Sequence, residues 1–177
     1  GGGRWAGGVR DDGGAMPGVG RPGLWSPVPK ARGRSALTTR NPFCICWGPD
    51  QICLYNDAYS LSLGPEKHPS ILGASARQAW PEIWDIIGPQ IEFVMRGEGA
   101  TWHENQLVPI LRHGAIQDVY WTYSYAPIDD EDAPHGVGGV LVVCTETTAH
   151  VLAERRLASE NGAFRQLFVQ APSFRAF

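Results

Sequence analysis

The order of extended and helical segments between residues 43 and 148 constrains the fold of this chain more than any other feature. Two short apolar runs, 43–47 and 52–55, flank a Gly-Pro-Asp turn signal and predict a β-hairpin. A helical region follows, and three longer strand-like runs come last: 100–112, 116–128 and 137–147. The predicted order is β-β-α-α-β-β-β, which indicates an α+β protein with one antiparallel sheet.

The helical region carries a single apolar stripe. Its members recur at helical spacing: Ile83, Ile87, Ile91 and Val94. Because a proline fits best at the first position of a helix, the Gly88-Pro89 pair predicts a break between two helices. We therefore expect a five-stranded antiparallel sheet with helices packed on one face.

The run 116–128 alternates with the period of a β-strand. One face carries Val119, Trp121, Tyr123 and Tyr125, and the other carries Tyr120, Thr122 and Ser124. Both faces hold large side chains. We expect helices over one face and either a flanking helix or a second protomer over the other.

Composition changes sharply near residue 40. Residues 1–40 hold eleven of the 22 glycines and four prolines without apolar periodicity, which predicts a disordered leader or an artefact of the gene model. Residues 41–148 read as one domain and 149–162 as a helical linker. Residues 41–177 carry sixteen acidic side chains against eight Lys and Arg, which argues against nucleic acid as a partner of the folded part.

The four cysteines all fall in apolar strand-like runs: Cys44, Cys46, Cys53 and Cys144. Cys44 and Cys46 share one strand face, and Cys53 can pair alongside them. We nevertheless expect reduced, buried thiols and no metal site, because further ligands at tetrahedral spacing are lacking and the sequence contains neither a Cys-x-x-Cys nor a His-x-x-x-His pattern. The longest apolar run is far shorter than the roughly 20 residues that span a bilayer, and no signal peptide is evident. A cytoplasmic location is therefore predicted.

No catalytic constellation is present. His103-Glu104-Asn105 is superficially similar to a phosphoacceptor box, but it lies in an alternating, strand-like segment, so we expect a solvent-facing histidine on the sheet. The glycine-rich run 136–139 precedes a strand directly and predicts a hairpin turn rather than a nucleotide-binding box. The acidic run 129–132 lacks the ligand pattern of a calcium loop and predicts a solvated turn.

Several short motifs occur in the order seen in one family. They are WGPD at 47–50, LYNDAY at 54–59, WPEIW at 80–84, YSYAPI at 123–128 and TETT at 145–148. Together they resemble the PAS domains of bacterial multidomain sensor histidine kinases, over about residues 42–148. Residues 149–157 resemble the helical linker that usually follows, and 163–177 resemble the truncated start of a second PAS domain.

The resemblance implies a sensory module of a two-component phosphorelay, which passes the state of a ligand or partner to a C-terminal helix. Two other functions stay open. One is a ligand-free scaffold that dimerises or positions its neighbours, and the other is a stand-alone enzyme built around a PAS-like cavity. The expected partners are a small molecule and a second copy of the chain, bound through flanking helices.

Aromatic and aliphatic side chains are the candidates for a ligand pocket: Trp84, Ile87, Ile91, Trp102, Trp121 and Tyr123. The flavin-adduct PAS type carries Asn-Cys-Arg on a helix, and haem-binding relatives carry a histidine on the long helix. This sequence has neither motif, so the cofactor is left unidentified. Thr147 and Thr148 form the predicted output junction, where one hydroxyl is expected to cap the following helix.

Overall fold

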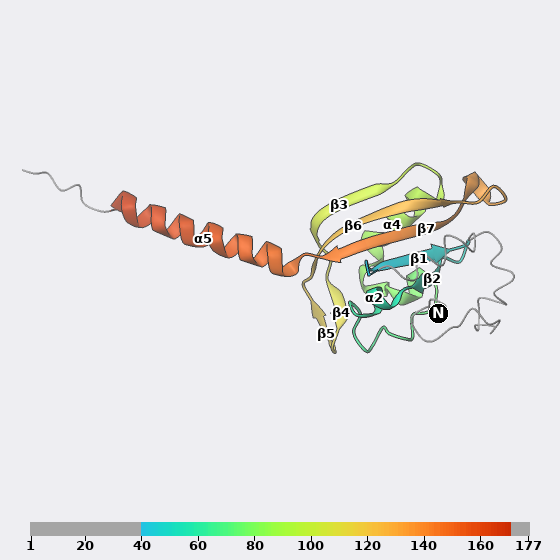
Figure 1. The fold of residues 1–177 in the computed structure, drawn as a ribbon, viewed down its shortest axis with the longest axis horizontal. Coiled ribbons are helices and arrows are strands. Elements are labelled where there is room, and N and C mark those ends of the chain that lie inside the picture. Colours follow the sequence, from blue (N-terminus) through green and yellow to red (C-terminus); the bar gives the residue numbers. More distant parts are fainter. Residues whose placement is uncertain (1–39, 171–177) are drawn as a thin grey trace, which may run out of the picture.

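The computed structural model describes residues 40–170, which form a five-stranded antiparallel sheet, a two-stranded hairpin and a set of helices. The sheet strands are β1 (Phe43–Trp47), β2 (Ile52–Tyr55), β3 (Thr101–Leu107), β6 (Tyr120–Asp129) and β7 (Val137–Glu146). Their spatial order is β2-β1-β7-β6-β3, so the first and last strands pair inside the sheet (Figure 1). The predicted α+β class and antiparallel sheet are confirmed.

Six helical segments accompany the sheet within residues 40–170. They are α2 (Asp57–Ser60), α3 (Ala76–Ala79), the 3-10 turn η2 (Pro81–Ile83), α4 (Trp84–Met95), the 3-10 turn η3 (Pro134–Gly136) and α5 (Thr148–Gln170). Helix α4 packs on β6 and β7, whereas α5 extends away from the body of the domain (Figure 1). Within residues 40–170, no helix combines the length and apolarity needed to cross a membrane.

The main core lies between the helices and one face of the sheet. The four members of the predicted apolar stripe, Ile83, Ile87, Ile91 and Val94, are all buried there. Burial of each such side chain contributes about 1.5–3 kcal/mol to folding. A smaller, separate cluster consists of Phe43, Ile45 and Leu54. Three partly buried side chains pack against this smaller cluster: Trp47, Ile128 and Leu141. Both sheet faces therefore carry apolar side chains, as the alternation in 116–128 predicted.

The predicted helix break at Gly88-Pro89 is wrong, because α4 runs through Pro89 as one helix. The buried residues Ile87 and Ile91 lie on either side of the proline and hold both halves against the sheet. That burial offsets the cost of about 3 kcal/mol or more that a proline imposes inside a helix. Gly88 is also needed here, since a Cβ at this position would lie 2.7 Å from the ring of Trp84.

The long runs 100–112 and 116–128 were each predicted as one strand, and each is divided. The first ends as β3 at Leu107 and resumes as β4 (Ile110–Arg112), with a register shift near Asn105, whose φ is 51°. The second divides into β5 (Ala115–Gln117) and β6. Strands β4 and β5 pair only with each other, so they form a separate hairpin rather than an extension of the main sheet.

The predicted linker 149–162 lies within the long helix α5. Residues 163–170 continue that helix, and the start of a second domain at 163–177 stays a prediction. Residues 171–177 and the leader at 1–39 lie outside the described residues.

Candidate functional site

The domain contains a cavity of about 70 Å³ between α4 and the inner face of the sheet. Its wall is mostly apolar. The helical side contributes Trp80, Ile83, Ile87 and Ile91, and the sheet contributes Trp121, Tyr123, Tyr125 and Val142. Tyr59 and Ser62 add hydroxyl groups from the segment around α2, and Val108 and Ile110 close the side next to the β4–β5 hairpin.

Two periodicities build this cavity. Ile83, Ile87 and Ile91 are four residues apart, so their side chains lie above one another on one face of the helical segment. Trp121 and Tyr123 are two residues apart on β6, so both point toward that face. The facing positions are filled by smaller side chains, among them Ala76 and Cys44, which leaves space between the layers.

Tyr123 brings a polar group to the cavity wall. Its hydroxyl donates to Gln106 Oε1 at 2.7 Å and lies 3.0 Å from the side-chain nitrogen of Gln90, which donates to it. Thr101 donates to Gln90 Oε1 at 3.2 Å, which fixes the orientation of the amide. Burial raises the pKa of Tyr123, so the phenol stays protonated near neutral pH.

The six predicted pocket residues divide into two groups. Ile87, Ile91, Trp121 and Tyr123 line the cavity. Trp102 does not, since it is 66% exposed on the alternate side of β3. Trp84 also lies outside the lining: it packs against the edge of the core, with the Arg77 guanidinium 5.8 Å from its ring centroid. A ligand role for the first four residues stays a prediction.

His103 lies on β3, which confirms its predicted strand context. The sequence predicted a solvent-facing ring. The His103 ring instead stacks on Tyr123, with the ring centroids 5.0 Å apart. Gly136 has a φ of 72° in the turn before β7, whereas residues 137–139 already belong to that strand, so the glycine-rich run leads from a hairpin turn into the last strand as predicted. Asp129 is the last residue of β6, and the acidic residues 130–132 follow it in the β6–β7 connection.

A buried ion pair was not foreseen from the sequence. Lys67 is 5% exposed, and its Nζ lies 2.8 Å from a carboxylate oxygen of Glu82. The same ammonium group donates to Ala79 O at 2.6 Å and lies 4.7 Å from the centroid of the Trp80 ring. Glu82 in turn accepts from the Leu111 N–H at 3.2 Å. The pair therefore ties the loop after α2 to the helical region and to the β4–β5 hairpin.

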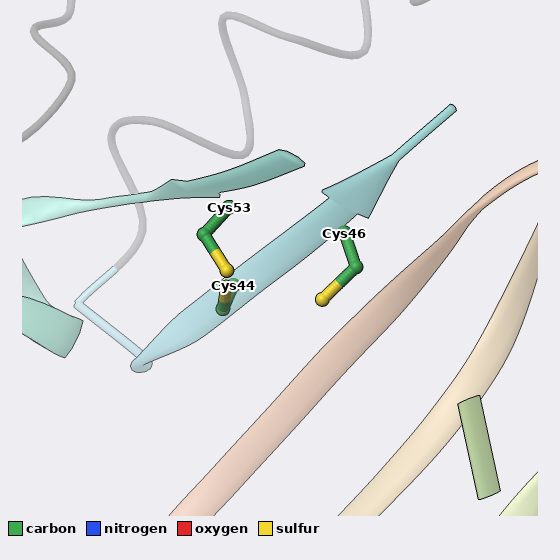
Figure 2. Close-up of side chains that lie close together, drawn as sticks. All are labelled: Cys44, Cys46 and Cys53. Carbon is green, nitrogen blue, oxygen red and sulfur yellow. The ribbon is translucent and has the colours of Figure 1, made fainter. Parts of the chain in front are cut away.

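Three of the four cysteines come together. Cys44, Cys46 and Cys53 are buried, and their Sγ atoms all lie within 4.8 Å of one another (Figure 2). Cys44 and Cys46 also line the cavity, as does Cys144, which is outside the group. From the sequence, Cys44 and Cys46 were expected on one strand face with Cys53 alongside, and the hairpin register brings the three together. A metal site was not expected, because further ligands at tetrahedral spacing are lacking.

The junction between β7 and α5 is built differently from the predicted cap. Thr148 Oγ1 accepts from the Tyr120 N–H at 2.9 Å, and the Thr147 N–H donates to Tyr120 O at 2.7 Å. Thr147 Oγ1 is buried and has no hydrogen-bond partner among the described residues. Neither hydroxyl caps α5. The helix start is instead fastened to β6, where the Arg155 guanidinium of α5 also lies 4.9 Å from the Tyr120 ring centroid.

A second contact joins the hairpin to the same end of the sheet. Arg112 on β4 forms an ion pair with Glu146 at the end of β7, at 2.9 Å. Glu146 is the strand partner of Trp121, which lines the cavity. The cavity wall, the β4–β5 hairpin and the start of α5 therefore meet within a few residues of one another.

Comparison with known proteins by sequence finds neither a matching family model nor a matching curated protein. By structure, the chain is similar to the PAS domain of a protein from Colwellia psychrerythraea, with a TM-score of 0.50 and 15% identity over 68% of this chain and 97% of that one. It is also similar to an RNA-binding light-oxygen-voltage receptor, with a TM-score of 0.52 and 14% identity over 80% of this chain and 39% of that one.

A sensory box sensor histidine kinase from Vibrio cholerae matches with a TM-score of 0.47 and 18% identity, over 66% of this chain and 87% of that one. At these identities, a structural likeness defines the fold and leaves the ligand and the activity open.

Proposed function

We propose that this chain, whose fold is that of PAS domains, is a sensory module that binds a small molecule in its cavity and relays occupancy through α5. The observation that carries the proposal is the cavity of about 70 Å³. Trp121 lines this cavity, and the residue before it, Tyr120, is hydrogen-bonded through its N–H to Thr148 at the start of α5. A sensor needs such a link between a binding site and an output element.

The cavity wall favours a compact ligand with an apolar body and one polar group. Its volume is well below the roughly 300–1,000 Å³ of pockets that take drug-sized molecules. The hydroxyls of Tyr59, Tyr123 and Tyr125 stay protonated, because burial raises the pKa of each. The hydroxyls of Tyr59 and Tyr125 can therefore exchange hydrogen bonds with a ligand hydroxyl or carbonyl without introducing charge, whereas the Tyr123 hydroxyl already donates to Gln106 Oε1.

The wider context is also part of the proposal. The sequence motifs resemble those of sensor histidine kinases, so we place the module in a two-component phosphorelay. The coding sequence downstream tests this: a histidine-box helix followed by the ATP-binding boxes would support it, and an unrelated domain would contradict it. Four buried, unpaired cysteines support a reducing compartment such as the cytoplasm.

A ligand-free scaffold is the second candidate, and exposed apolar side chains favour it. Trp102 is 66% exposed on the sheet, and Leu152 and Leu157 are 52% and 60% exposed on α5. Large exposed apolar groups of this kind mark interaction surfaces when they cluster. In this reading the chain pairs with a second copy through its flanking helices, and the cavity stays unused.

Titration of the isotopically labelled 177-residue chain with phenol, followed by NMR, separates the two candidates. Phenol has an aromatic body and one hydroxyl, which matches the wall of the cavity. The sensor proposal expects saturable shifts of the Ile87 and Ile91 methyl signals and of the backbone amides at the start of α5.

The variant Ala76→Leu fills part of the cavity and should abolish these shifts, whereas Ala153→Leu on exposed α5 should leave the shifts at the cavity unchanged. Absence of saturable shifts in the native sequence would favour the scaffold. In that case sedimentation should find a dimer that Leu152→Glu dissociates.

A further inference from the structure

Three thiols converge at the hairpin that forms one wall of the cavity. Cys44 and Cys46 are two residues apart on β1, so both side chains point to the inner face, and Cys53 on β2 is the strand partner of Cys46. Figure 2 shows the three side chains on these two neighbouring strands. All three residues are at most 3% exposed.

The hairpin register brings the sulfurs close. The backbone of Cys53 is engaged on its far side: its N–H donates to Ala74 O and its carbonyl accepts from Gly73 N. Cys46 and Cys53 therefore form a non-hydrogen-bonded pair, the type in which facing side chains lie closest. Cys44 occupies the neighbouring inward position, so its thiol completes a triangle.

The triangle has the size that a three-coordinate site requires. With ion–sulfur bonds of about 2.3 Å, three thiolates around one ion lie roughly 3.4–4 Å from one another, closer in a pyramidal site than in a planar one. The three Sγ atoms already lie within 4.8 Å of one another. Closing the site therefore requires only a short approach of the sulfurs, of the kind that rotation about the Cα–Cβ bonds provides.

The surroundings decide which charge the ion should carry. The thiols lie among buried side chains that include Tyr55, Tyr59, Val140 and Val142. A net charge in such surroundings is strongly unfavourable unless it is paired. Three thiolates with a divalent ion leave one negative charge, and with a monovalent ion they leave two. Only a trivalent ion gives a neutral complex.

We propose that Cys44, Cys46 and Cys53 form a binding site for a trivalent thiophilic ion, of the class of arsenic(III) and antimony(III). This site goes beyond the proposed function, since it requires neither an organic ligand in the cavity nor a relay through α5. Entry is through the cavity, because Cys44 and Cys46 line it.

The binding step with arsenous acid balances without an oxidant or reductant. Each thiol replaces one hydroxyl group: a sulfur–arsenic bond forms, an arsenic–oxygen bond breaks, and the thiol proton leaves with the hydroxide as water.

The test uses the reduced full chain in degassed buffer, titrated with sodium arsenite. We expect one arsenic per chain by intact mass, together with near-ultraviolet absorption from sulfur–arsenic bonds. Cys53→Ser and Cys46→Ser should weaken binding by about 10- to 100-fold or more, since loss of a ligand costs at least as much as loss of an outer-shell partner. Cys144→Ser should bind as the native chain does, because Cys144 lines the same cavity outside the triangle.

X-ray absorption at the arsenic edge of the native chain tests the site without any substitution. Three sulfur neighbours and no oxygen are expected. Two or fewer sulfurs, no binding, or equal loss in Cys144→Ser would overturn the site. Tighter binding of Zn²⁺ than of arsenite in a parallel titration would overturn the charge argument and with it the trivalent class.

Discussion

At the scale of single residues, the ion pair between Lys67 and Glu82 is more deeply buried than the other ion pairs described in the domain. Both side chains are largely buried, at 7% and 15% exposure. Lys67→Ala leaves the Glu82 carboxylate without its counter-ion, so we expect a loss of about 3–5 kcal/mol in the free energy of unfolding. Urea denaturation followed by circular dichroism measures it.

Arg77→Ala is the matched control, because Arg77 is exposed and its guanidinium lies over the Trp84 ring, 5.8 Å from the centroid. It should cost less than about 1 kcal/mol. Equal effects of the two substitutions would contradict the structural role assigned to Lys67.

Glu66 gives a pH-dependent prediction at the same scale. A hydrogen bond with its own backbone N–H, and then the amide groups of Gly114 and His113, lower the pKa of Glu66 from its ordinary value of 4.5. A depressed folded-state pKa adds stability above the unfolded-state value, and this stability is lost as the pH falls through the folded-state value.

Glu66→Gln should therefore be less stable than the native chain at pH 7, and the difference should shrink below about pH 4.5. Thermal unfolding over a pH series measures the difference, with Glu160→Gln on α5 as the control. A difference that persists unchanged at pH 3 would show that the carboxylate charge is not responsible.

Sequence periodicity could identify only part of the site. Ile87 and Ile91 follow from the helical stripe, and Trp121 and Tyr123 follow from the strand alternation. Trp102 was chosen for its aromatic ring, but it lies on the outward side of β3. Lys67 and Glu82 lie 15 residues apart in a loop and a 3-10 turn, where no periodicity links them.

At the scale of elements, the β7–α5 junction offers a matched pair of substitutions. Thr148→Val removes the acceptor of the Tyr120 N–H and should cost about 1–3 kcal/mol, because a largely buried donor is left unpaired. Thr147→Val replaces a hydroxyl without a described partner by a methyl group, so it should be neutral or stabilising.

Chemical denaturation of both variants, with hydrogen exchange at the Tyr120 amide, measures these effects. The exchange rate should rise only in Thr148→Val. A larger loss of stability in Thr147→Val than in Thr148→Val would show that the helix start is held by the hydroxyl cap and not by β6.

The elements themselves were largely predictable where one pattern continues without interruption. The hairpin at 43–55 and the strand at 137–146 lie where apolar runs predicted them. The turn at His113-Gly114 between the runs 100–112 and 116–128 was predicted and is the turn of the β4–β5 hairpin. The separation of that hairpin from the main sheet was missed, because the register shift near Asn105 has no signal in the apolar pattern. Pro89 was read as a helix start, but tertiary packing of Ile87 and Ile91 overrides local preference.

At the scale of the whole molecule, the cavity, the hairpin and α5 converge at one end of the sheet. Arg112 on the hairpin holds Glu146, and Glu146 is paired across the sheet with Trp121 of the cavity wall. Glu66, in the loop after α2, accepts hydrogen bonds from the N–H groups of His113 and Gly114 in the turn of the same hairpin. A ligand that moves Trp121 would therefore act on groups that also hold the start of α5.

Glu146→Gln tests this coupling in the whole domain. The ion pair is partly exposed, at 18% and 34%, so its loss should cost no more than about 1 kcal/mol of stability. Phenol should still shift the Ile87 and Ile91 methyl signals, because the cavity wall is unchanged, but the shifts at the start of α5 should fall by at least half.

Glu98→Gln is the matched control, since Glu98 pairs with Arg96 after α4, at a distance in sequence from the β7–α5 junction. It should leave both sets of shifts as they are in the native chain. If α5 responds fully in Glu146→Gln, the Arg112–Glu146 pair is not a coupling element, and the hydrogen bonds between Tyr120 and the two threonines are left as the connection between cavity and helix.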